Sequence, residues 1–104
     1  MTYEEMYVRT VTQNGGWLDQ VPLSYRTPEV CLAAVTGYGW ALLFVPETLR
    51  APETCLAAVT QDGWALMWVP ETLRTPEICL AAIRQNSKAL KYSPWSILEL
   101  MSMT

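Results

Sequence analysis

Three cysteines are the most reactive side chains of the chain, and they recur at a fixed interval. Cys31, Cys55 and Cys79 stand 24 residues apart. A cysteine becomes a nucleophile when a basic neighbour lowers its pKa, and cysteines hold zinc when they lie at short spacing. Each of these cysteines is instead surrounded by leucine and alanine. Because their number is odd and their spacing equal, we interpret all three as reduced, buried side chains outside any disulfide.

Acid–base chemistry has few candidate residues in this sequence. Histidine, the most common general base and metal ligand, is absent. Glu47, Glu53, Glu71 and Glu77 could provide paired carboxylates. Their recurrence at expected helix starts has a simpler cause, since a carboxylate there interacts favourably with the helix dipole. We therefore expect no catalytic residue, no cofactor site and no metal site.

Arginines form a second series with the same spacing. Arg26, Arg50 and Arg74 could together bind phosphate groups or an acidic peptide. A glutamate follows each arginine by three residues and neutralises its charge. We therefore expect exposed arginine–glutamate pairs, which stabilise a protein by only about 0–1 kcal/mol each.

Large aromatic residues form a third series. Phe44, Trp68 and Tyr92 are 24 residues apart, and Trp40 and Trp64 precede the first two by about one helical turn. An exposed groove of aromatic rings would bind a peptide. Packing in a hydrophobic core would use the same residues. The sequence leaves both alternatives open, and core packing is the simpler one.

All of these series arise from one unit of 24 residues that occurs about four times. The segments 26–35, 50–59 and 74–83 align without gaps, and a less regular first copy begins at Thr2. We interpret residues 1–104 as a single domain of stacked helices with a capping helix at its C-terminal end. The copies cover about 2–25, 26–49, 50–73 and 74–97, and the capping helix extends to residue 104.

Prolines and threonines predict where the first helix of each copy begins. Pro28, Pro52 and Pro76 suit the first helical position, where a missing N–H costs nothing. Thr27 and Thr75 then stand at the N-cap, whereas the third copy has alanine there. This pattern predicts a helix over residues 28–37 and over the equivalent residues of the other copies.

The second half of each copy predicts further short helices. Glycines at 15, 39 and 63 have the position of helix terminators. A short helix is expected over 40–45 and over 64–69, although short apolar runs also suit strands. Their alanine and leucine content favours helix. One more helical turn is expected over 46–50, and a last helix is expected from Ser93 and Pro94 onward.

Positions that vary between copies indicate the outer surface. The series Leu43, Met67 and Lys91 mixes apolar with charged residues, and so does the series that begins with Tyr38. Such positions are expected to face solvent. Tyr38, Leu43 and Met67 would then form an exposed apolar patch, which is typical of a binding interface.

Composition excludes several classes of partner. The 104 residues carry a net charge of −3, and the five arginines and two lysines form no basic stripe. We therefore expect no binding to nucleic acid or to an anionic membrane. The apolar runs are far shorter than the roughly 18 residues of a membrane helix. The N-terminus is acidic and has no apolar segment, so we expect no signal sequence there. These features predict a cytoplasmic protein, although a protein exported as an effector would look the same.

The copies resemble a known repeat. The strings TPEVCLAAVTGYGWALLFVPETLR and APETCLAAVTQDGWALMWVPETLR are similar to the bacterial tandem repeat known as domain of unknown function 4116. The resemblance covers residues 27–92 well and the first copy loosely. Lys88 and the pair Gly15–Gly16 depart from the repeat pattern. The resemblance implies helices stacked in tandem, and it implies no particular activity.

The predicted fold is therefore all-α, a short and solenoid-like array of helical repeats with two short helices in each unit. Stacked repeats create extended surfaces, which favours a non-catalytic protein–protein interaction module. A self-associating structural protein, which would use the open ends of the array or the methionine-rich tail, is the alternative. An enzyme is the third class, but the chain lacks histidine and any phosphate-binding or nucleophile–base motif.

Overall fold

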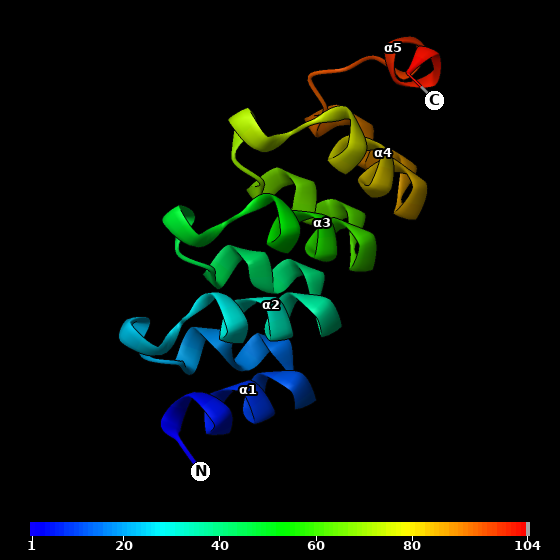
Figure 1. Cartoon of the computed structure of the whole chain (residues 1–104). Helices are drawn as coiled ribbons and strands as arrows, with labels where there is room; N and C mark the ends of the chain where they lie inside the picture. Colours follow the sequence, from blue (N-terminus) through cyan, green and yellow to red (C-terminus); the bar gives the residue numbers. More distant parts are fainter. Residues whose placement is uncertain (104) are drawn as a thin grey trace.

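The computed structural model describes residues 1–103, which form a stack of short helices (Figure 1). The prediction of an all-α fold is confirmed, because no strand occurs in this part of the chain. The molecule measures 49 × 22 × 19 Å along its principal axes. The two termini lie at opposite ends of the stack (Figure 1).

Two kinds of helix alternate along the chain and form two layers. One layer consists of α-helices, and each α-helix contacts the next one. The other layer consists of 3₁₀ helices, labelled η, which also contact their successors. The α-helices are α1 (Tyr3–Gln13), α2 (Pro28–Gly37), α3 (Pro52–Gln61) and α4 (Pro76–Gln85). The 3₁₀ helices of the second layer are η1 (Gly15–Gln20), η3 (Gly39–Phe44), η5 (Gly63–Trp68) and η7 (Ser87–Tyr92).

The α-helices begin where the sequence predicts. The hydroxyl oxygen of Thr27 accepts a hydrogen bond from the backbone N–H of Val30 at 3.3 Å, and Thr75 caps α4 in the same way. Thr2 caps α1 by accepting from the N–H of Glu5 at 3.1 Å. At the start of α3, Ala51 forms no such bond. The predicted helix over 28–37 is thus confirmed, together with its caps.

The second half of each unit is also helical, but its helices are 3₁₀ and begin one residue earlier than predicted. Side-chain oxygens of Asn14, Asp62 and Asn86 accept hydrogen bonds at the starts of η1, η5 and η7. The extra turn predicted after them is present as a three-residue 3₁₀ helix. These turns are η2 (Leu23–Tyr25), η4 (Glu47–Leu49) and η6 (Glu71–Leu73).

The prediction that Gly15, Gly39 and Gly63 terminate helices was wrong about their role. None of them adopts a positive φ. They are glycines because the next α-helix lies too close for a side chain. A Cβ on Gly39 would lie 2.3 Å from the carbonyl oxygen of Ala58, and a Cβ on Gly63 would lie 2.3 Å from that of Ala82. Glycine therefore sets the distance between successive units.

The last helix begins later than predicted. Ser93 and Pro94 precede it, and α5 spans Ile97–Ser102. Ser96 and Glu99 form a capping box, in which each side chain accepts from the backbone N–H of the other residue. This reciprocal cap places the helix start at Ser96. Residue 104, the end of the predicted capping helix, lies outside the described residues.

The core runs between the two layers. Cys31, Ala34 and Val35 of α2 are fully buried as predicted, whereas Leu32 is half-buried. Leu18, Leu42 and Leu66 fill the equivalent place in successive 3₁₀ helices. Burying a side chain of this size stabilises a protein by about 1.5–3 kcal/mol. The small alanines and cysteines let the α-helices approach the 3₁₀ layer closely.

Candidate binding surface

One side of the 3₁₀ layer faces solvent in every unit. A 3₁₀ helix has three residues per turn, so residues three apart point in the same direction. In η3 this places Trp40 above Leu43, on the side away from the buried Ala41 and Leu42. Leu43 is 45% exposed, and its equivalent Met67 is 41% exposed. We call these outward positions the outer strip; it comprises Gly16, Asp19, Trp40, Leu43, Trp64, Met67, Lys88 and Lys91.

Neighbouring units touch along the outer strip. A Cβ on Gly16 would lie 3.5 Å from the ring of Trp40, so this indole packs over the preceding unit. At the other end, Nζ of Lys91 lies 5.1 Å from the ring centroid of Trp64, in cation–π geometry. Between these two contacts, η3 lies against η5, so the strip passes along all four 3₁₀ helices.

The charges of the outer strip lie at its two ends. Asp19 is exposed on η1, and Lys88 and Lys91 are exposed on η7. Between them the strip carries only tryptophan, leucine and methionine. The repeat alignment contained the signal for the lysine end, because Lys91 shares the phase of Leu43.

The structure brings two of the three predicted surface residues together and places the third apart from them. Leu43 and Met67 lie on the outer strip, on adjacent 3₁₀ helices. Tyr38 is 38% exposed but stands at the N-cap of η3, five residues from Leu43. That separation corresponds to roughly 10 Å along the helix and to a different side of it. Tyr38 packs edge-on against Trp40 of the strip, with ring centroids 4.7 Å apart.

The predicted aromatic series lies between the core and the surface. Phe44, Trp68 and Tyr92 are half-buried and pack against the core. Phe44 meets Trp40 edge-on at 5.7 Å between centroids, and Tyr92 meets Trp64 at 6.1 Å. Phe44 and Tyr92 thus pack between the core and the tryptophans of the outer strip. This position favours the core interpretation over a groove.

The arginines have a structural role that the sequence analysis missed. Each guanidinium donates three hydrogen bonds to backbone carbonyls at the ends of two successive 3₁₀ helices. Arg50 donates to Val45 at 3.0 Å, Leu43 at 3.3 Å and Trp68 at 2.9 Å. Arg26 and Arg74 repeat this pattern. They are half-buried links between units rather than the exposed ion-pairing residues that we expected.

The cysteines are fully buried and free. Burial raises the pKa of Cys31 and of Cys55 to about 11, and the nearby Arg26 and Arg50 lower these pKa values by a smaller amount. Burial also raises the pKa of Cys79. The spacing contained a signal for this arginine influence, because each arginine lies five residues before its cysteine. At neutral pH the thiols are protonated, which is unfavourable for a nucleophile.

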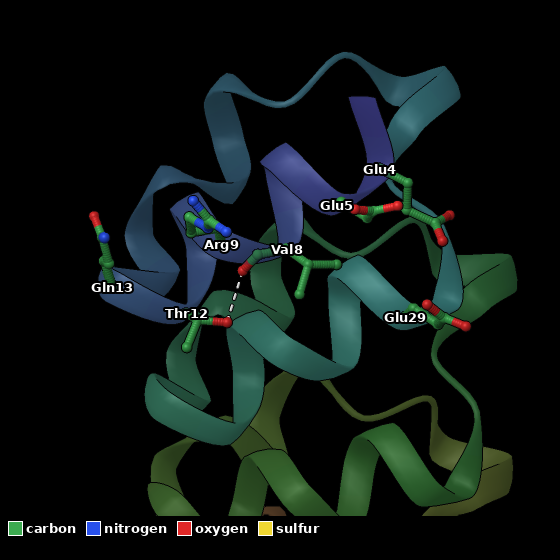
Figure 2. Close-up of a pocket in the computed structure, with 7 residues that line it drawn as sticks. All are labelled: Glu4, Glu5, Val8, Arg9, Thr12, Gln13 and Glu29. Carbon is green, nitrogen blue, oxygen red and sulfur yellow. Dashed lines mark hydrogen bonds between the residues drawn. The ribbon is translucent and has the colours of Figure 1, made fainter. Parts of the chain in front are cut away.

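A hollow lies on the other layer, between α1 and α2 (Figure 2). It has a volume of about 580 Å³ and is open to solvent. Figure 2 shows the side chains of Glu4, Glu5 and Glu29 along one part of it and Arg9 and Gln13 along another. A similar hollow between α2 and α3 is lined by Glu53, Leu56, Ala57, Thr60, Gln61 and Thr36. Since the hollow recurs, it reflects the spacing of the α-helices rather than a specialised site.

The described part of the chain has neither a cluster of metal ligands nor a helix that could span a membrane. Residues 1–103 contain no group of three histidine, cysteine, aspartate or glutamate side chains placed to hold a metal ion. Within the same residues, every helix is too short or too polar to cross a membrane.

Comparison with known proteins gives one match. Searches of curated proteins and of solved structures gave no significant similarity. The family described as "Domain of unknown function (DUF4116)" matches residues 52–98. These residues comprise α3, η5, α4 and η7, so the family covers both layers and the lysine end of the outer strip. The resemblance inferred from the repeat pattern is confirmed over residues 52–98, which match the model of the DUF4116 family.

Proposed function

We propose that the protein is a short, solenoid-like array of helical repeats that binds another protein through its outer strip and carries out no catalysis. Contacts between successive helices in both layers support the array. The three arginine links, which recur every 24 residues, support it further. In such arrays the side chains that vary between units lie on one face and determine the partner.

The observation that carries the proposal is the apolar centre of the outer strip. Leu43 and Met67 are exposed beside the half-buried Trp40 and Trp64. Tryptophan is enriched among residues that dominate binding energy, and clustered exposed apolar side chains are typical of interfaces. Helices α2, α3 and α4 differ, because their exposed residues are mainly polar, such as Glu53 and Thr60. In the same layer, α1 also exposes Tyr3 and Met6.

The reactive groups of the chain favour binding over catalysis. The thiols are buried and protonated at neutral pH, and the arginines are occupied by backbone carbonyls. The three free cysteines suit a reducing compartment, so we place the protein in the bacterial cytoplasm.

An affinity capture experiment tests this function. The bait is the whole chain, and the test variant is Leu43→Lys, Met67→Lys. The matched control is Leu23→Lys, Leu98→Lys, because both leucines are strongly exposed but lie outside the outer strip. We expect a partner that the wild type and the control variant capture and the strip variant loses. A partner that the strip variant retains would overturn the assignment of the binding face.

A further inference from the structure

We infer that the occupant of the outer strip is a second copy of this chain, bound antiparallel across a two-fold axis. This inference rests on the proposed function, since it takes the outer strip as a protein-binding surface. It adds the identity of the partner and its orientation.

The order of side chains along the strip carries the inference. Asp19 stands at one end, the apolar centre follows, and Lys88 and Lys91 stand at the other end. When a second strip faces the first one and runs in the opposite direction, its lysines lie opposite Asp19 of the first. A two-fold axis between η3 and η5 also places Leu43 opposite Met67 of the second copy. The surface is therefore complementary to itself, as a two-fold symmetric interface requires.

The same charges exclude the parallel arrangement. Two strips in the same direction would place lysines opposite lysines and Asp19 opposite Asp19. Like charges that face each other disfavour an association, whereas complementary charges fix its register. Glu71 and Arg74 line a small hollow together with Lys91, so the charges of Glu71 and Arg74 offset each other beside this lysine. Lys88, one turn earlier on η7, is exposed on the same side of this helix.

The dimensions of the strip set the expected strength. A stable interface covers about 800 Å² on each partner, which is most of one long face of a molecule of 49 × 22 × 19 Å. Leu43 and Met67 are less than half exposed, so little apolar surface remains to be covered. We therefore expect a weak and reversible dimer, and a dissociation constant of about 10–100 μM is the range to test.

Sedimentation velocity tests the inference with the whole chain. Samples would span about 1 μM to about 1 mM, across the expected dissociation constant. We expect the wild type to pass from monomer to dimer and not to larger species. Leu43→Lys should weaken the dimer at least about tenfold, whereas Leu23→Lys, outside the outer strip, should leave it unchanged. Circular dichroism and urea midpoints would show that every variant is folded.

A charge swap tests the orientation. Asp19→Lys alone places lysine opposite lysine, and Lys88→Asp, Lys91→Asp places aspartate opposite aspartate. Each should weaken the dimer about tenfold at low salt. The triple variant that combines these changes restores opposite charges and should restore dissociation to within about threefold of the wild type. Failure of this rescue in a folded protein would overturn the antiparallel arrangement.

The remaining outcomes separate this inference from the proposed function. A wild type that stays monomeric at all concentrations would overturn self-association, while a strip-dependent partner in the capture experiment would still support the proposed function. The wild type could instead form species larger than a dimer. If Leu98→Lys abolished these species and Leu43→Lys did not, the chain would associate end to end. That result would overturn both the antiparallel dimer and the proposed function.

Discussion

The first junction of the stack differs from the two later ones in a single polar link. Between the second and third units, the side-chain oxygen of Gln61 accepts a hydrogen bond from the backbone N–H of Gly39. Gln85 and Gly63 repeat this bond between the third and fourth units. At the first junction the equivalent of Gln61 is Gly37, which has no side chain to offer. The arginine link, by contrast, is present at all three junctions.

This difference indicates that the stack requires the arginine link and that the glutamine link adds stability to it. The arginine uses backbone carbonyls as acceptors, and these exist in every unit whatever its sequence. The glutamine link needs one particular side chain, so a single substitution removes it. We therefore expect the arginines to contribute more to stability than the glutamines, and the first junction to be open to improvement.

The largest effect is expected for Arg50→Ala. This change removes three hydrogen bonds from a charged donor and leaves three carbonyls without their partner. The free energy of unfolding should fall by about 3 kcal/mol, measured by urea denaturation. Arg50→Lys is the control, since it keeps the charge but cannot reach three carbonyls at once. If Arg50→Ala changed stability by less than the loss of the Gln85 side chain, the ranking of the two links would be wrong.

A somewhat smaller loss is expected for Gly63→Ala. The added Cβ would meet the carbonyl oxygen of Ala82 at 2.3 Å, and a backbone atom cannot move aside without separating the units. The free energy of unfolding should fall by about 2 kcal/mol. Ser87 occupies the equivalent position in the last unit and is exposed, so Ser87→Gly should change stability little. Equal effects of the two substitutions would contradict the close-contact role of the glycines.

The first junction should gain stability from Gly37→Gln. A Cβ at residue 37 meets nothing within 4 Å, so the side chain can be accommodated. Replacing glycine within a helix contributes about 1 kcal/mol, and the new bond to the N–H of Gly15 contributes about 0.5–1 kcal/mol. Gly37→Ala isolates the helix contribution. If the thermal unfolding midpoints of the two variants were the same, the glutamine link would have no value at this junction.

The smallest effect is expected at the start of α3, which differs from α2 and α4 in lacking a side-chain cap. Ala51→Thr should supply the bond that Thr27 and Thr75 make and should raise the free energy of unfolding by about 1 kcal/mol. Thr27→Ala should lower it by a similar amount. An unchanged or lowered urea midpoint for Ala51→Thr would contradict the role assigned to these caps.

Local rules predicted most of the helices. The Thr-Pro pairs at 27–28 and 75–76 placed α2 and α4 correctly, because a cap and a fixed φ act within one turn. The same rule failed at Ser93–Pro94, because the capping box of Ser96 and Glu99 lies three residues further along and competes with it. The roles of the glycines and arginines depend on the approach of backbone atoms from the next unit, which local sequence does not reveal.

The candidate surface was predictable in part. Variation between copies identified Leu43 and Met67 as outward residues, and the structure places both on the surface. Asp19 was missed because the first copy matches the other copies less regularly. Gly15 corresponds to Gly39 in the structure, so Trp17 occupies the place of the buried Ala41 and is itself 52% exposed.

The arginine links have a consequence for how such a chain can change in length. Every link joins the same positions in the repeat. An arginine guanidinium donates to backbone carbonyls at the ends of two successive 3₁₀ helices. A tandem duplication of residues 50–73 would therefore carry its own arginine, its own contact glycine and its own acceptors. The molecule could lengthen or shorten by whole units without a change at either end. Gene duplication can therefore adjust its length in steps of one 24-residue unit.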